Sequence, residues 1–133
     1  MAMAMLGAKF AGARAMCATS GGGFALMTES ISFSHQAEIG GVYILSQRDG
    51  PSTGTPTFTA QGDLNYALNA SFGDTSPVVL APSTFAETYE MISRALNRSD
   101  IYQHPVVFLI DKQLSEGYQT VEVNKLKITP IDR

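Results

Sequence analysis

An arginine at the head of a proline- and glycine-rich segment is the strongest candidate for chemistry in this chain. Arg48 follows an apolar run and precedes residues 49–57, which hold two prolines, two glycines and four hydroxyl residues. Such a segment continues neither a strand nor a helix, so it forms a shaped loop. The guanidinium suits a carboxylate or phosphate, in a contact worth roughly 1.5–3 kcal/mol. The alternative is a structural ion pair with Asp49, Asp63 or Asp74.

A run of three glycines is the second candidate. Ser20 is followed by Gly21, Gly22, Gly23 and Phe24, where we expect a helix to begin. Glycines let a ligand approach the main chain closely, and free N–H groups favour an anion or a polar ring edge. The spacing is neither G-x-G-x-x-G nor G-K-[ST], which excludes the dinucleotide fingerprint and the phosphate loop. The alternative is a tight strand-to-helix turn that needs a positive φ.

The remaining reactive side chains have no partner that the sequence identifies. His35 and His104 lack the spacing of a metal site, so we expect each at a helix surface or a strand end, and no metal site. Cys17 lies in an apolar run and is predicted to be a buried, inert thiol. Ser20 is outside a G-x-S-x-G motif, which argues against a hydrolase nucleophile.

Four apolar runs without clean alternation predict the strands that position these residues, at 14–19, 41–46, 77–81 and 105–111. Strands that are apolar on both sides belong to a parallel sheet covered on both faces. The segments between them predict helices at 23–37, 61–69 and 84–102, after a first helix at the N-terminus. We therefore expect an α/β three-layer sandwich with a mostly parallel sheet, and ligands at the carboxyl edge of that sheet.

The segment 84–102 has the strongest helix signal. Ser83 suits the N-cap position. Tyr89, Ile92 and Leu96 recur at helical spacing and predict a buried stripe.

Composition excludes several classes of protein. With 133 residues, of which 44% are hydrophobic and 16% charged, the chain has room for one domain and is too apolar to be disordered. A net charge of −3 and a pI of about 5.2 argue against nucleic acid or an anionic membrane as a partner. The single cysteine excludes an internal disulfide framework and fits a reducing cytosol, so we expect a cytoplasmic protein.

The ends of the chain carry separate expectations. Residues 1–6 are apolar but follow no positive charge, and Lys9 and Arg14 come soon after, so a helix is expected and not a signal peptide. A helix that opens without a capping residue is typical of a piece of a longer protein. We expect one domain over 1–117, and an edge strand or a linker over 118–133.

Five runs carry a resemblance to a known family: ARAMCATSGGGFALMTESI, QRDGPSTGTPT, QGDL, VVLAPST and PVVFLID. In this order they resemble the α subunit of the 2-oxoacid:ferredoxin oxidoreductases, which are thiamine diphosphate enzymes. The triple glycine followed by Phe-Ala-Leu-Met is most similar to members whose γ and α parts are fused. The resemblance implies an incomplete pyrimidine-binding domain of the thiamine fold, with 118–133 leading into the next domain.

The resemblance implies roles for individual residues. Arg48 would hold the carboxylate of the 2-oxoacid, and Thr57 would line the substrate side of the same pocket. The loop near the cofactor would comprise Ser20, Gly21, Gly22, Gly23 and Phe24. A partner β subunit would hold the diphosphate with its Mg²⁺ and an iron–sulfur cluster. Asp49 stands where many relatives have glycine or proline, and a carboxylate there that pairs with Arg48 would weaken substrate binding.

The family also carries elements that this chain lacks. In its members a Tyr-Pro-Ile-Thr-Pro strand and a glutamate precede the helix that corresponds to residue 1 onward, and the glutamate activates the cofactor. The resemblance therefore implies a fragment without a catalytic residue, inactive alone and part of an oligomer. The whole enzyme would convert a 2-oxoacid to acyl-CoA and pass electrons to ferredoxin. The alternative is a non-catalytic assembly or binding module of the thiamine-fold type.

Overall fold

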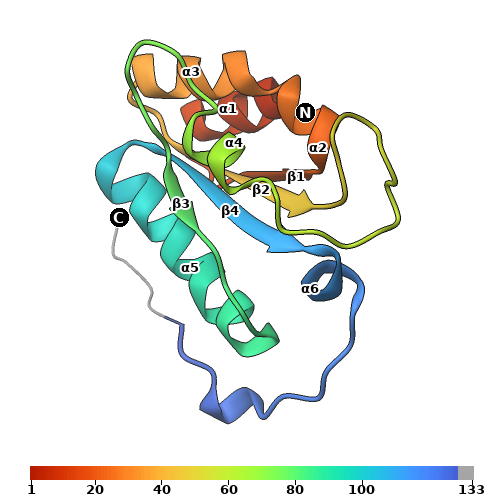
Figure 1. Ribbon diagram of the computed structural model, residues 1–133. Coiled ribbons are helices and arrows are strands. Elements are labelled where there is room, and N and C mark those ends of the chain that lie inside the picture. Colours follow the sequence, from red (N-terminus) through yellow and green to blue (C-terminus); the bar gives the residue numbers. More distant parts are fainter. Residues whose placement is uncertain (129–133) are drawn as a thin grey trace.

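The computed structural model describes residues 1–128, which form a four-stranded sheet with helices on both faces (Figure 1). The strands are β1 (Met16–Thr19), β2 (Gly41–Gln47), β3 (Val78–Leu80) and β4 (Pro105–Asp111). The helices are α1 (Ala2–Phe10), α2 (Gly21–Ala25), α3 (Thr28–Gln36), α4 (Leu64–Leu68), α5 (Phe85–Tyr102) and α6 (Lys112–Glu116), followed by the 3₁₀ turn η1 (Val123–Lys125). The order in the sheet is β1-β2-β4-β3 and every neighbouring pair is parallel, so the predicted α/β sandwich is confirmed.

The two central strands are apolar on both sides because each face is covered by helices. Tyr43 and Leu45 of β2 point into a core shared with α1, α2, α3 and α4. Val42 of β2 and Phe108 of β4 point to the opposite face, where they pack with Ala95 of α5. This two-sided burial explains why the sequence shows no period-two alternation at these strands.

Several helix predictions need correction. The helix expected over 23–37 is two helices, α2 and α3, which meet at Leu26 and Met27. The N-cap of α5 is Thr84 and not Ser83: the Thr84 hydroxyl accepts a hydrogen bond from the Glu87 main-chain N–H at 3.1 Å. Ser83, the residue before the N-cap, donates its N–H and its hydroxyl to the Glu87 carboxylate, and these hydrogen bonds lower the pKa of Glu87.

The buried stripe predicted for α5 is shorter than expected. Ile92 and Leu96 are half-buried and pack against the sheet, but Tyr89 is 44% exposed. Tyr89 lies in the first turns of α5, and the core cluster on this face contains no residue of α5 before Met91.

No edge strand forms over residues 118–128, where η1 is the one regular element (Figure 1). The Lys127 main-chain N–H donates to the Glu90 carboxylate at 3.0 Å and ties this segment to α5. The remainder of the predicted tail, 129–133, lies outside the described residues. Among the described helices none has both the length and the apolar composition to cross a membrane.

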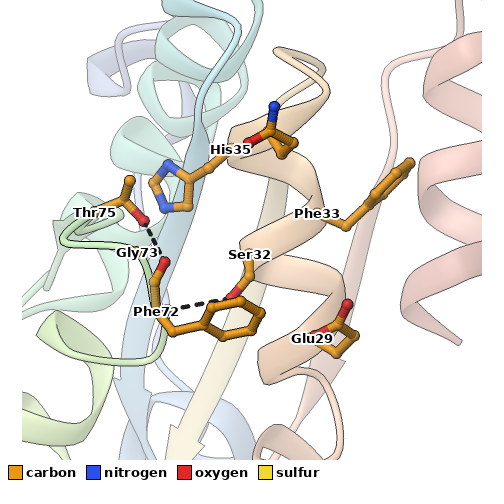
Figure 2. A pocket seen from close by; sticks show the side chains of 8 residues that line it. Glu29, Ser32, Phe33, His35, Phe72, Gly73 and Thr75 are labelled. Atoms are coloured by element: carbon orange, nitrogen blue, oxygen red, sulfur yellow. Dashed lines mark hydrogen bonds between the residues drawn. The ribbon is translucent and has the colours of Figure 1, made fainter.

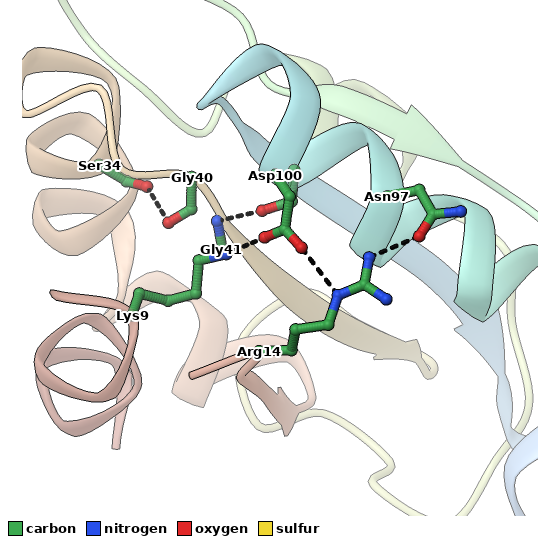
Figure 3. A network of polar contacts seen from close by, with 8 residues as sticks. Lys9, Arg14, Ser34, Gly40, Gly41, Asn97 and Asp100 are labelled. Atoms are coloured by element: carbon green, nitrogen blue, oxygen red, sulfur yellow. Dashed lines mark hydrogen bonds and ion pairs between the residues drawn. The ribbon is translucent and has the colours of Figure 1, made fainter. Parts of the chain in front are cut away.

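A polar network joins the first part of the chain to α5 at the amino edge of the sheet (Figure 3). Lys9 and Arg14 both bind the Asp100 carboxylate, and Arg14 also donates to the Asn97 side chain. Burial would raise the pKa of Asp100, but the hydrogen bonds from Lys9 and Arg14 hold it below its usual value. Arg14 is engaged here, and this is consistent with β1 beginning only at Met16.

Candidate functional site

The carboxyl ends of three adjacent strands bring the predicted site residues to one edge of the sheet. Ser20 follows β1 and Arg48 follows β2, which pair in parallel. Asp111 ends β4, where its side chain accepts the Leu114 main-chain N–H and starts α6. In Figure 1 these ends lie beside α2, α6 and the loop after β2. The parallel topology therefore brings together residues that lie up to about ninety positions apart in the sequence.

The Arg48 guanidinium lies against the main chain of Gly21. A Cβ atom added to Gly21 would be 3.2 Å from Arg48 Nε and 3.5 Å from one terminal nitrogen. Gly21 also has φ +25°, which disfavours a side chain. Arg48 Nε is buried without a hydrogen-bond partner, and no hydrogen bond or ion pair is recorded for its terminal nitrogens among residues 1–128. The terminal nitrogens of a half-buried guanidinium are therefore available to an anion.

The three carboxylates proposed as ion-pair partners behave differently. Asp49 accepts a hydrogen bond from the Thr55 hydroxyl, within its own loop. Asp63 lies beside Arg48, and the two border one hollow. Burial raises the pKa of Asp63, partly offset by a hydrogen bond from the Arg48 main-chain N–H and by the Arg48 charge. Asp74 belongs to a loop at the other edge of the sheet, between α4 and β3. Within the described chain Arg48 has no carboxylate oxygen within 4.0 Å of its guanidinium, so it forms no closed ion pair.

The three glycines differ in what surrounds them. Gly22 has nothing within 4 Å of an added Cβ, so its main chain faces open space. An added Cβ at Gly23 would lie 2.0 Å from Thr19 Oγ1, so a residue with a side chain does not fit there unless Thr19 moves. Phe24 is fully buried, edge-on to the Tyr66 ring at a centroid distance of 5.3 Å. The Phe24 side chain thus anchors α2 to the core, while Ser20, Gly21 and Gly22 remain at the sheet edge.

Arg48 borders two hollows. One has a volume of about 280 Å³, and its walls include Gly21, Gly22, Asp63 and Tyr66. The other has a volume of about 500 Å³ and is lined by residues at the ends of strands and directly after them, among them Thr19, Ser20, Gln47, Lys112 and Ser115. Arg48 therefore lies between the two hollows, one beside α2 and the other beside α6.

Thr57 lies apart from these hollows. Its side chain is exposed on the loop after β2, and its carbonyl accepts a hydrogen bond from Lys112 Nζ. Pro56, one residue earlier, lines the larger hollow. The structure thus brings Ser20, Gly21 and Arg48 together but leaves the Thr57 side chain outside.

Other polar residues at this edge were not identified from the sequence. Gln47 is 6% exposed, and its Oε1 accepts the Asp63 main-chain N–H at 3.1 Å. Gln61 Nε2 donates to Asp111 Oδ2 at 2.8 Å. The available signal was positional, since Gln47 and Asp111 are the last residues of two strands that pair with each other.

The two histidines, which we expected at separate surface positions, are in contact. Their ring centroids are 4.2 Å apart with an interplanar angle of 77°. Both ring nitrogens of His35 are buried without a partner, and burial, with a smaller contribution from His104, lowers the pKa of His35 to about 4. His104 Nε2 lies 3.1 Å from the Ser76 carbonyl. Figure 2 shows His35 beside Thr75 and Phe72 in a hollow at the amino edge, remote from Arg48.

Cys17 is 7% exposed in β1, and burial raises the pKa of its thiol, so the prediction of a buried thiol is confirmed. Within residues 1–128 no three histidine, cysteine or acidic side chains are grouped so as to hold a metal ion.

Comparison with known proteins identifies the family. Residues 1–132 match the family described as pyruvate flavodoxin/ferredoxin oxidoreductase, thiamine diphosphate-binding. The chain belongs to this family. The resemblance found in the sequence motifs, and the thiamine diphosphate-binding fold that it implies, are therefore confirmed.

Curated relatives of this family domain are α subunits from archaea. The chain is 45% identical over 114 residues to 2-oxoacid:ferredoxin oxidoreductase 2, subunit alpha, of Aeropyrum pernix, covering 86% of this chain and 18% of the relative. It is 40% identical over 123 residues to 2-oxoacid:ferredoxin oxidoreductase 1, subunit alpha, of Sulfurisphaera tokodaii, covering 92% and 20%. It is 42% identical over 109 residues to 2-oxoglutarate synthase subunit KorA of Methanocaldococcus jannaschii, covering 82% and 30%.

A solved structure shares the fold of this family domain. It is a 2-oxoglutarate:ferredoxin oxidoreductase from Magnetococcus marinus with 2-oxoglutarate, coenzyme A and succinyl-CoA bound, and it superposes with a TM-score of 0.82 at 39% identity. The match covers 85% of this chain and 20% of that one. The chain therefore spans between about a fifth and a third of the length of the relatives it matches.

Proposed function

We propose that this chain is part of the α subunit of a 2-oxoacid:ferredoxin oxidoreductase. The whole enzyme decarboxylates a 2-oxoacid oxidatively to acyl-CoA and passes the electrons to ferredoxin. Support comes from relatives that are 2-oxoacid:ferredoxin oxidoreductase α subunits and a 2-oxoglutarate synthase subunit. Residues 1–117 serve as the pyrimidine-binding domain, and 118–133 as the link to the next one.

Arg48 is the observation that carries this proposal. Arg48 lies at the carboxyl edge of the sheet between two hollows, and its terminal nitrogens make no hydrogen bond or ion pair with residues 1–128. A guanidinium placed in this way binds the planar carboxylate that every 2-oxoacid carries. In this proposal Thr57 approaches the same substrate only when the loop after β2 folds toward Arg48.

The glycine run fits one face of thiamine diphosphate. When bound, this cofactor supplies the carbanion chemistry of decarboxylation. Ser20, Gly21 and Gly22 present main chain at the edge, and Gly22 has open space where a Cβ would be, so a flat heteroaromatic ring can approach closely. Gly23 packs closely against Thr19, and the Phe24 ring packs against Tyr66. These two contacts fix the position of residues 20–22.

A partner subunit supplies the other cofactor contacts. An iron–sulfur cluster needs several cysteine thiolates, and the one cysteine of this chain is buried in β1. We therefore assign the cluster, and the Mg²⁺ with the diphosphate, to a β subunit in an oligomeric, cytoplasmic enzyme.

The test is an activity assay on the complete α subunit co-expressed with its β partner. Coenzyme A-dependent reduction of a viologen dye is measured with a panel of 2-oxoacids, with and without thiamine diphosphate. Reduction that requires both the oxoacid and the cofactor is expected, and the panel names the substrate. An assembled, cofactor-loaded complex without activity would contradict the proposal and favour the non-catalytic assembly module.

Replacing Arg48 tests its role within that enzyme. Arg48→Ala removes the charge-assisted contact and is expected to raise the 2-oxoacid KM about 10- to 100-fold, while thiamine diphosphate content stays unchanged. Arg48→Lys keeps the charge but not the planar arrangement of donors. Its KM should therefore lie between the values for the unaltered enzyme and for Arg48→Ala. Arg94→Ala, an exposed arginine on α5, is the matched control. Unchanged kinetics in Arg48→Ala would remove Arg48 from the site.

A further inference from the structure

One oxygen of the Asp63 carboxylate, beside Arg48, is buried and has no hydrogen-bond partner. Asp63 Oδ2 and Arg48 Nε have almost no contact with solvent and no hydrogen-bond partner. One is an acceptor and the other a donor, and both residues border the hollow that Tyr66 helps to form. Buried polar atoms without partners are rare in proteins, and two of opposite kind beside one another point to a shared role.

Asp63 is fixed to the end of β2 through its main chain. Its N–H donates to Gln47 Oε1 at 3.1 Å, and Gln47 is the last residue of that strand. Its carboxyl faces the Arg48 main-chain N–H and the Arg48 positive charge. Asp63 thus ties the far end of the loop after β2 to Gln47 and Arg48, the residues at which this loop begins.

The two sides of the Arg48 guanidinium are therefore different. Nε and one terminal nitrogen lie against Gly21, which borders the same hollow as Asp63. Arg48 also lines the larger hollow, together with Lys112, Ser115 and Glu116. The Asp63 carboxyl accepts a hydrogen bond from the Arg48 main-chain N–H, so it holds this residue without occupying the guanidinium nitrogens that a ligand would use.

We propose that Asp63 is a positioning residue for Arg48, which holds the end of β2 and the enclosed side of the guanidinium so that the terminal nitrogens face the ligand. The inference rests on the proposed role of Arg48 in binding a 2-oxoacid and deepens it. Asp63 itself does not contact the substrate carboxylate, because two carboxylates would repel each other.

The first test compares two Asp63 variants in the complete, assembled enzyme. Asp63→Ala is expected to raise the 2-oxoacid KM about tenfold, since a charged group loses its orienting contact, while kcat stays within about twofold. Asp63→Asn keeps an acceptor of the same shape and should restore KM to within about threefold of the original value. The control is Asp74→Asn, which removes an exposed carboxylate from a loop remote from Arg48.

An unchanged KM in Asp63→Ala, when Arg48→Ala raises KM, would overturn the inference. So would a KM in Asp63→Asn as high as in Arg48→Ala. If Asp63→Ala does not assemble, Asp63→Ser replaces it under the same criterion, because serine suits the N-cap position of α4 but its side chain is shorter than that of aspartate.

The second test does not depend on activity. Hydrogen exchange of peptides that cover residues 42–50 is expected to quicken at Arg48 in Asp63→Ala and to stay slow in Asp63→Asn and Asp74→Asn. Unchanged exchange in Asp63→Ala would overturn the inference even if the enzyme is active. If Arg48→Ala leaves KM and kcat unchanged, the proposed role of Arg48 in binding the 2-oxoacid is wrong. The hydrogen-exchange result then still decides whether Asp63 positions Arg48.

Discussion

At the scale of single residues, the geometry of Arg48 depends on the absence of a side chain at Gly21. The guanidinium lies tightly against the position that a Cβ would take, since the added atom would be 3.2 Å from Nε. Gly22, the next residue, has no such neighbour. Two adjacent glycines thus have different functions, one that makes room for an arginine and one that leaves open space at the sheet edge.

This difference predicts the effect of Gly21→Ala. The new methyl group crowds the guanidinium, which must shift slightly, and strains a φ of +25°, so we expect the 2-oxoacid KM of the complete enzyme to rise about fivefold. Gly22→Ala leaves Arg48 in place and should affect thiamine diphosphate affinity before it affects that KM. Steady-state kinetics and cofactor titration of both variants check this. Equal effects of the two substitutions on KM would show that Arg48 does not depend on Gly21.

At the scale of elements, the direction of the parallel strands decides which residues meet. Their carboxyl ends bring Ser20, Arg48 and Asp111 to one edge. Their amino ends bring the end of α3 to the start of β4, which places His35 against His104. The histidine contact joins two elements that are 69 positions apart in the chain, and neither histidine has a neighbour in sequence that predicts it.

The buried histidine predicts a pH dependence of stability. The pKa of His35 is lowered from 6.5 to about 4 in the folded chain. The unfolded chain therefore takes up this proton first, and the free energy of unfolding should fall by on the order of 2 kcal/mol as the pH drops from 6.5 to about 4. His35→Phe keeps a ring against His104 and should flatten this part of the profile. Urea denaturation between pH 4 and 7 measures it, and identical profiles would contradict the assignment.

At the scale of the whole molecule, one edge of the sheet and one end of the domain are open to association. β1 is a terminal strand of the sheet, and its Met16 is 52% exposed. Further large apolar side chains are exposed near the start of the chain, at Met1, Met3, Phe10 and Leu26. Open strand edges and exposed apolar side chains favour pairing with other chains. The relatives are considerably longer than this chain, so in a longer protein other segments would have access to this surface.

We therefore expect the 133-residue chain by itself to self-associate as its concentration rises. Met16→Lys places a charge at the open edge and should reduce the association. Glu29→Gln, on the first turn of α3, raises the net charge by the same single unit and controls for that change. Static light scattering over a concentration series is the measurement. A monomer at high concentration in the unaltered chain would contradict the prediction.

Much of the fold and the family could be predicted from the sequence. The four strands appear where apolar runs predicted them, within a few residues at each end, because burial on both faces leaves an uninterrupted apolar signature. The helix boundaries were less predictable. The break between α2 and α3 and the choice of Thr84 over Ser83 as N-cap depend on packing and on a hydrogen bond of one particular hydroxyl.

The candidate site divides in the same way. The chemical nature of Arg48 and of the glycine run was evident from residue type and spacing, because a fixed charge and an absent side chain are properties of the residues themselves. The partners of these residues were not evident, because Gly21 meets Arg48, and Asp49 and Asp63 come to border the hollow beside it, only once β1 and β2 pair and the loop closes. Residue chemistry and hydrophobic periodicity can be read directly from the sequence. Contacts between distant residues depend on the order of the strands in the sheet and on the paths of the loops, so only the tertiary structure decides them.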